Sequence, residues 1–197
     1  MYYEKMNSIL NDIENREIEI AGGSVVGIVL STINSLIKYT SNLTLDKKNY
    51  ENVQENIKVI LEKAEELKEK ALETIDNDKE ILEEILKAYK LRKENSINYQ
   101  QVCKKAVNFC MDVVNIANET LKLSDEISKV GNKMLSSDFK ICKYYSIASV
   151  QSAMENVYIN LKAVEDEEYT NRIESECKEI LEGIQKFIWK GGWICKF

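Results

Sequence analysis

The stretch AGGSVVGIVLSTINSLI, from Ala21 to Ile37, has no charged residue in a chain in which 30% of the residues are charged. Such an apolar run predicts a helix at the centre of the fold. It opens with Gly22-Gly23-Ser24, where glycines let a backbone approach a ligand closely and Ser24 can cap the first free N–H groups. Two interpretations follow: a core helix entered through an ordinary glycine turn, or a central helix whose N-terminus faces a pocket.

Composition indicates a single helical domain over all 197 residues, because the chain has no proline and only 7 glycines. The net charge of -6 argues against a nucleic-acid partner. Ala21–Ile37 is too short, and too rich in Ser, Thr and Asn, for a membrane span. The N-terminal MYYEKMNSILNDIENRE is charged and amphipathic, unlike a secretory signal. We therefore expect a cytoplasmic protein without a membrane partner.

Hydrophobic periodicity predicts six or seven helices and no strand. They cover about residues 2–16, a run that starts at Ser24, 49–75, 79–92, 98–129, 138–164 and a last segment from 166. Asp76-Asn77-Asp78 is expected to interrupt the third pattern, with Asn77 and Glu80 spaced as a capping pair. Gly131-Asn132 is expected to end a helix as a C′ glycine does. The fold class is thus an all-α, single-domain multihelical bundle.

The helix that begins near Asp138 has an unusual third side. Besides a core face and a charged face, it carries a stripe of small, uncharged hydrogen-bonding residues that ends in a carboxylate; its members are Asp138, Cys142, Tyr145, Ser149, Ser152, Asn156 and Asn160. Such a stripe is typical either of a polar seam between helices or of the wall of a ligand groove. Periodicity alone leaves both interpretations open.

The available chemistry is restricted because the chain has no histidine. Proton transfer must use Asp, Glu, Lys, Tyr or Cys, and the usual metal constellations are absent, so no metal site is predicted. The five cysteines, Cys103, Cys110, Cys142, Cys177 and Cys195, form no CxxC pair and are interpreted as reduced thiols. Asp78 lies on the inward-facing stripe of its predicted helix. An acidic residue near the start of a helix commonly stabilises it by interacting with the helix dipole.

Five groups of short motifs follow one another along the chain. They are Ala21-Gly22-Gly23-Ser24; Asn42-Leu43-Thr44 with Lys47-Lys48-x-Tyr50; Asp76-Asn77-Asp78 with Ala88-Tyr89-Lys90-Leu91-Arg92-Lys93; Gly131-Asn132 with Ser137-Asp138; and Asn156-Val157-Tyr158-Ile159-Asn160-Leu161-Lys162 with Asp166-Glu167. In this order they resemble the formiminotetrahydrofolate cyclodeaminase/methenyltetrahydrofolate cyclohydrolase family. The resemblance runs from residue 21 to 183 and leaves 184–197 as a C-terminal tail. The chain departs from the family pattern at Ile20, Arg92 and Cys110, where the family has prolines, and at Ala21 and Met134.

The resemblance implies an all-helical homodimer that binds a reduced folate and needs no cofactor beyond that tetrahydrofolate substrate. It implies hydrolysis of 5,10-methenyltetrahydrofolate to 10-formyltetrahydrofolate, which we prefer because no formiminotransferase domain accompanies the chain. The alternatives are a formiminotetrahydrofolate cyclodeaminase that releases ammonia and a non-catalytic helical folate-binding or interaction protein. Asp78 and Asp138 are the implied catalytic residues, expected to flank one pocket. The implied substrate-binding residues are Gly22, Gly23, Ser24, Asn42, Lys47, Lys48, Tyr89, Lys93, Asn132, Asn156 and Asn160.

Overall fold

The computed structural model describes residues 1–14 and 20–190, and this part of the chain is all-helical. Its elements are α1 (Tyr2–Glu14), α2 (Gly22–Asn42), the 3-10 helix η1 (Lys48–Val53), α3 (Gln54–Lys90), α4 (Ser96–Val130), the 3-10 helix η2 (Lys133–Leu135), α5 (Ser136–Leu161) and α6 (Glu167–Lys190). The expected all-α, single-domain class is confirmed. The predicted helix end at Arg16 and the thiol Cys195 lie outside the described residues.

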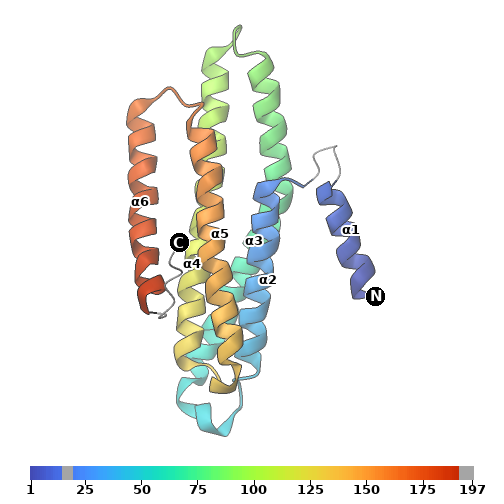
Figure 1. Ribbon diagram of the computed structural model, residues 1–197, viewed down its shortest axis with the longest axis vertical. Helices are drawn as coiled ribbons and strands as arrows, with labels where there is room; N and C mark the ends of the chain where they lie inside the picture. Colours follow the sequence, from blue (N-terminus) through green and yellow to red (C-terminus); the bar gives the residue numbers. More distant parts are fainter. Residues whose placement is uncertain (15–19, 191–197) are drawn as a thin grey trace.

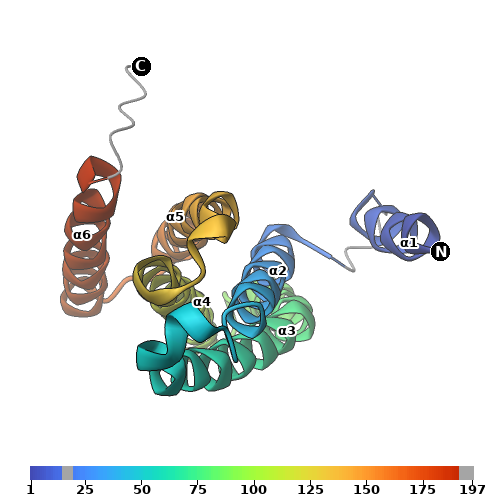
Figure 2. The ribbon, with the colours of Figure 1, turned by 90° about the horizontal axis from the view of Figure 1, so that it is seen from below.

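Helices α2, α3, α4 and α5 form an antiparallel bundle, as Figures 1 and 2 show from two directions. Helix α6 runs along the outside of α4 and α5, and the α3–α4 hairpin extends beyond the start of α2 (Figure 1). Helix α1 stands apart from the bundle in both views and buries none of its residues. The bundle therefore holds the core, and α1 contributes nothing to it within this chain.

The uncharged helix α2 lies at the centre, as its sequence predicts. Its Leu30 and Ile37 are fully buried and pack with apolar side chains from every other bundle helix, among them Ile57, Val114, Leu121, Val150 and Val157. Some polar side chains inside this core are hydrogen-bonded to one another, whereas Asn34 Oδ1 and Ser41 Oγ are buried without a hydrogen-bond partner among the described residues. Asn34 Nδ2 donates to Thr120 Oγ1 at 3.0 Å, and the hydroxyls of Ser124 and Ser146 lie 3.2 Å apart. The central position of α2 brings its N-terminus against α3.

Gly27 sets how closely α2 and α3 approach. A Cβ at this position would lie 2.5 Å from Thr74 Oγ1 and 2.8 Å from the Ala71 carbonyl oxygen, so only glycine fits. The contact joins residues that are far apart in the sequence.

The expected interruption at Asp76-Asn77-Asp78 is wrong, because α3 continues through it from Gln54 to Lys90. An Asp or Asn breaks a helix when its side chain competes for nearby backbone groups. The Asp78 carboxylate instead binds Ser24 of α2, which leaves the backbone of α3 to form its own helical bonds.

Gly131 ends α4, but not for the expected reason. Its φ of -74° and ψ of 168° are extended, not left-handed. A Cβ here would lie 2.5 Å from Phe139 Cζ and 2.7 Å from the Ile127 carbonyl oxygen. Glycine is therefore required by close packing between the end of α4 and the start of α5. None of the helices among the described residues is both long and apolar enough to cross a membrane.

Candidate functional site

The N-terminus of α2 is capped by a carboxylate from another helix. The helix begins at Gly22, and the residue before it, Ala21, provides no side-chain cap. Ser24 N–H donates to Asp78 Oδ2 at 2.9 Å, and the Ser24 hydroxyl lies 3.0 Å from both Asp78 Oδ2 and the Ile75 carbonyl oxygen. The expectation that the helix starts at Ser24, with Ser24 as its own cap, is wrong. Asp78 supplies the cap.

The two glycines of this turn have different surroundings. A Cβ on Gly23 would lie 2.2 Å from Asp78 Oδ1, whereas one on Gly22 would meet no atom within 4 Å. Gly23 therefore makes room for the Asp78 carboxylate. Close approach to a ligand, which was the expected role of both glycines, is open only to Gly22.

Helices α4 and α5 complete this cluster. The Asn160 Nδ2 group donates to the Asn156 carbonyl oxygen at 2.8 Å and to Cys110 Sγ at 3.5 Å. Burial, together with the nearby charge of Asp78, raises the pKa of the Cys110 thiol to about 12, so the thiol is neutral at physiological pH. We call the residues Gly22, Gly23, Ser24, Asp78, Cys110, Asn156 and Asn160 the Asp78 cluster.

The Asp78 cluster is open to solvent on one side. Asp78, Asn156 and Asn160 are half-buried, and Gly22 is exposed. Four helices thus bring together three of the predicted motifs. Sequence reasoning missed Cys110 as a member, because heptad spacing from Cys103 marks it only as a small core residue.

Two further predicted residues lie beyond the cluster, at the tip of the α3–α4 hairpin. The Tyr89 ring packs edge-on against Tyr99 at 6.0 Å, and the Arg92 guanidinium lies 3.7 Å from the centre of the Tyr89 ring. Lys93 is exposed in the turn that follows α3. Tyr89 is eleven residues after Asp78 on α3, about 16 Å along the helix.

The other predicted residues gather at the opposite end of the bundle. Asn132 N–H donates to Thr44 Oγ1 at 3.0 Å, which ties the turn after α4 to the turn after α2. Nearby, Asn42, Lys47 and Lys48 are exposed. Asp138 lies half-buried in the first turn of α5. We call Asn42, Lys47, Lys48, Asn132 and Asp138 the Asp138 set.

A single chain does not bring Asp78 and Asp138 to one pocket. Asp138 lies one turn before Cys142, whose Sγ lies 4.0 Å from the Ile33 carbonyl oxygen. Ile33 is in turn nine residues along α2 from Ser24, the partner of Asp78. Helix rise therefore places the two carboxylates roughly 20 Å apart along the bundle.

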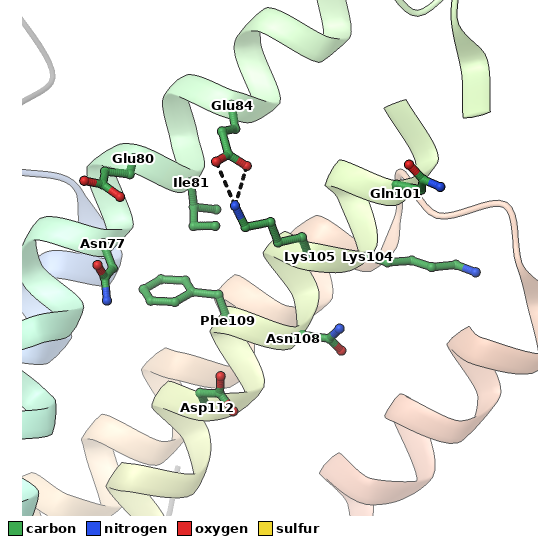
Figure 3. Close-up of a pocket in the computed structure, with 10 residues that line it drawn as sticks. All are labelled: Asn77, Glu80, Ile81, Glu84, Gln101, Lys104, Lys105, Asn108, Phe109 and Asp112. Atoms are coloured by element: carbon green, nitrogen blue, oxygen red, sulfur yellow. Dashed lines mark hydrogen bonds and ion pairs between the residues drawn. The ribbon is translucent and has the colours of Figure 1, made fainter. Parts of the chain in front are cut away.

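A cavity of about 570 Å³ opens between α3 and α4, away from the predicted residues (Figure 3). Ile81 and Phe109 form its apolar part, and Lys105 Nζ lies 2.7 Å from both carboxylate oxygens of Glu84. Its Asn77 and Phe109 are chain neighbours of Asp78 and Cys110, respectively, so the cavity lies on the other side of the α3–α4 contact. Neither Asp78 nor Asp138 lines it.

Comparison with known proteins identifies the family. A model described as formiminotransferase-cyclodeaminase matches residues 5–179, a span that holds both the Asp78 cluster and the Asp138 set. The chain belongs to the formiminotransferase-cyclodeaminase family.

Two relatives of this family member are informative. A protein of Methylorubrum extorquens named methenyltetrahydrofolate cyclohydrolase is 27% identical over an alignment of 188 residues that covers 92% of this chain and 88% of that protein. The crystal structure of formiminotetrahydrofolate cyclodeaminase from Thermotoga maritima matches with a TM-score of 0.85 and 28% identity, over 90% of this chain and 88% of that one. The likeness therefore spans the whole bundle.

In this family member two members of the polar stripe of α5, Tyr145 and Ser152, are exposed, and its other neutral members fall into two parts. Cys142 and Ser149 are buried, and Ser149 Oγ donates to the Tyr145 carbonyl oxygen. This part is the polar seam against α2. Asn156 and Asn160 lie at the open end, within the Asp78 cluster. Among the described residues, the Asp, Glu and Cys side chains form no group of three that could hold a metal ion.

Proposed function

We propose that this protein hydrolyses 5,10-methenyltetrahydrofolate to 10-formyltetrahydrofolate and needs no cofactor beyond the folate itself. The observation that carries the proposal is the Asp78 carboxylate at the open end of α2. Ser24 holds its Oδ2, and the cluster around it is accessible from solvent. The name of the Methylorubrum extorquens relative supports the choice of reaction.

The chemistry needs a fixed negative charge and a proton acceptor. The methenyl carbon lies between N5 and N10 in an amidinium cation, which a carboxylate stabilises electrostatically. Water adds to this carbon and loses a proton to a carboxylate; the bond from carbon to N5 then breaks, and N5 takes up a proton. Because the chain has no histidine, these transfers fall to Asp, Glu, Lys, Tyr or Cys, and we assign them to the carboxylates of the site. Two hydrogen bonds from Ser24 hold the Asp78 carboxylate in place, so we assign Asp78 as the fixed charge that stabilises the cation. Asp138 is then the proton acceptor.

A homodimer would join these two carboxylates. Helices α2 and α5 present a neighbouring pair of stripes without a charged residue, which we call the α2–α5 surface. It consists of Val25, Ile28, Val29, Thr32, Ser35, Leu36 and Tyr39 on α2, and Ile141, Tyr145, Ala148, Ser152 and Ile159 on α5. None of these side chains is fully buried, and Tyr39, Tyr145 and Ile159 are between 53% and 60% exposed. A second copy would cover this surface.

Two-fold symmetry would complete the site. The Asp78 cluster lies at one end of the α2–α5 surface and the Asp138 set at the other. An isologous dimer about an axis across the helices reverses the partner, so each Asp78 cluster meets the partner's Asp138. The partner's Lys47 and Lys48 would then lie at the same end, where their charge suits the glutamate tail of the folate. The apolar face of α1, with Tyr2, Met6 and Leu10 exposed, is a further surface for the partner to cover.

Subunit complementation tests this arrangement. Asp78→Asn and Asp138→Asn are each expected to abolish turnover. In a mixed dimer of the two variants, one site carries both substitutions and the other carries none. With random assortment about a quarter of the wild-type activity should return. Sites contained within single chains would give no activity in the mixture, and sedimentation of a stable monomer would remove the basis of the proposal.

The second candidate function is the formiminotetrahydrofolate cyclodeaminase reaction, favoured by the match to the Thermotoga maritima structure. Purified protein should be assayed against both folates, following methenyl absorbance and released ammonia. Loss of the methenyl signal without ammonia supports the cyclohydrolase, and ammonia release from the formimino substrate supports the cyclodeaminase. Folate binding without either reaction indicates the non-catalytic alternative.

We further propose that the protein works in the cytoplasm. The described cysteines, Cys103, Cys110, Cys142 and Cys177, are buried and unpaired, as is typical of a reducing compartment. Fractionation of cells that express a tagged copy tests the proposal.

A further inference from the structure

The carboxamide of Asn160 is held in one orientation by two acceptors. One hydrogen of its Nδ2 faces the Asn156 carbonyl oxygen at 2.8 Å, and the other faces Cys110 Sγ at 3.5 Å. A carbonyl oxygen can only accept, so the amino group must point that way. Within the described part of the chain, Asn160 Oδ1 has no hydrogen-bond donor. The side chain therefore offers an acceptor to whatever binds beside it.

Cys110 fixes the plane of this amide. It lies on α4, only 7% exposed, and reaches Asn160 across the packing of α4 against α5. The Asn156 contact alone allows the amide to swing about its own helix, whereas a second acceptor from another helix removes that freedom. The sulfur thereby does more than fill space in the core.

The Asp78 cluster thus leaves Asn160 Oδ1 as an acceptor for its ligand. A ligand that carries N–H donors matches this acceptor, and the pterin ring of a reduced folate carries such donors in its N3–H and 2-amino groups. The methenyl carbon, where the Asp78 carboxylate acts in the proposed reaction, lies on the far side of the ring from these donors. A ligand carboxylate would instead be repelled by Asp78.

On the basis of the proposed folate function, we propose that Cys110 is a positioning residue. It orients Asn160 so that Oδ1 accepts a hydrogen bond from an N–H group of the reduced pterin ring.

The test compares three variants, Cys110→Ala, Cys110→Ser and Cys103→Ala. Cys103 is the matched control, because it is a buried thiol one heptad earlier on α4 and lies beside Tyr99, away from Asn160. Turnover of methenyltetrahydrofolate gives KM and kcat, and titration with tetrahydrofolate gives Kd. Loss of one neutral hydrogen bond corresponds to a change of about 3- to 10-fold.

Cys110→Ala should raise KM and Kd by about this factor and leave kcat within about twofold. Cys110→Ser should restore both constants, because the serine hydroxyl also accepts. Cys103→Ala should leave them unchanged. The proposal is overturned if Cys110→Ala shifts only the thermal unfolding midpoint, as Cys103→Ala does, or if serine fails to restore binding.

A spectroscopic measurement separates this proposal from the proposed function. In protein labelled with ¹⁵N-asparagine, the side-chain NH₂ signals of Asn160, assigned with Asn160→Asp, should exchange slowly with water in the wild type and in Cys110→Ser. They should exchange faster in Cys110→Ala. Equal exchange in all three proteins refutes the positioning role whether or not folate is turned over. A wild type that binds and converts no folate refutes the proposed function even when the exchange rates differ.

Discussion

A matched pair of glycine substitutions tests the capping of α2 by Asp78. Gly22 and Gly23 are adjacent in the first turn, yet a Cβ on Gly22 meets no atom within 4 Å and one on Gly23 lies 2.2 Å from Asp78 Oδ1. Gly23→Ala must push the carboxylate away from α2, whereas Gly22→Ala adds a methyl group in open space. The two variants differ by the Asp78 contact and share the same gain in helix propensity.

The magnitude follows from the bonds that are lost. Displacing Asp78 breaks its contacts with the Ser24 amide, at 2.9 Å, and with the Ser24 hydroxyl, at 3.0 Å. A hydrogen bond to a charged group contributes about 1.5–3 kcal/mol, and the half-buried carboxylate regains some hydration when displaced. Gly23→Ala should therefore lower the free energy of unfolding by about 2–4 kcal/mol. Gly22→Ala should leave it unchanged or raise it by about 0.5 kcal/mol.

Urea unfolding followed by far-ultraviolet circular dichroism measures both values in this all-helical protein. A double-mutant cycle then isolates the contact. In an Asp78→Ala background the atoms that collide with the new Cβ are absent, so Gly23→Ala should cost almost nothing there. The reasoning fails if Gly23→Ala is as stable as Gly22→Ala, or if it destabilises the Asp78→Ala protein by the same amount.

Three further predictions have defined outcomes. Gly27→Val should lower the free energy of unfolding by about 3 kcal/mol or more, because its Cβ would lie 2.5 Å from Thr74 Oγ1 and 2.8 Å from a backbone oxygen. Urea unfolding measures this change, and Gly183→Val, at a glycine with no atom within 4 Å of an added Cβ, is the control. Burial raises the pKa of Asp125, but hydrogen bonds from Lys129 and Lys143 outweigh it and lower the pKa below its ordinary 3.8. The ionised carboxylate therefore stabilises the fold above pH 3.8. This contribution is lost as the pH falls through the folded-state pKa. Asp125→Asn should thus lower the free energy of unfolding by about 1 kcal/mol at neutral pH and leave it unchanged in acid. Asp112→Asn should instead raise the free energy of unfolding at neutral pH, because burial raises the pKa of Asp112. Urea unfolding curves at neutral and acid pH contradict this reasoning if the difference between variant and wild type is the same at both. Iodoacetamide should label Cys110 and Cys142 only after denaturation, since burial raises the pKa of both thiols to about 12; mass spectrometry that finds either one labelled in the native protein would show that the core opens.

Helical periodicity predicts most of this fold because each bundle helix buries one face. The uncharged run from Ala21 is the central helix, and helix ends fall within a few residues of their expected positions, except in α3. The exception has a physical cause. Asp76-Asn77-Asp78 has the residue types that commonly interrupt a helix, but Asp78 is hydrogen-bonded to Ser24, 54 residues away. A prediction from neighbouring residues does not take a partner at that sequence distance into account. Gly131 likewise satisfies a packing requirement set by Phe139, not the backbone conformation that its position suggests.

The candidate site, like the fold, depends on both local sequence and contacts between distant residues. Sequence motifs predict which residues carry the chemistry, and the packing of the helices determines which of these residues lie close together. Gly23, Ser24, Asp78 and Asn160 come together because four helices converge at the N-terminus of α2. Cys110 joins them without any local signal, since a buried small residue at heptad spacing is indistinguishable from an ordinary core residue until its neighbour Asn160 is known.

The separation of Asp78 from Asp138 is itself informative about assembly. Two sets of predicted residues lie at opposite ends of the α2–α5 surface, whose residues carry no charge. A surface needed only for solubility would be charged, and a site complete within one chain would not be divided across roughly 20 Å of helix. The proposed two-fold axis through the middle of the α2–α5 surface would account for both features with one operation: it would cover the uncharged stripes and place each Asp78 cluster beside the partner's Asp138. Dimer formation and catalysis should therefore be lost together when the centre of this surface is charged, as in Ala148→Glu, while the helical content of the chain is retained.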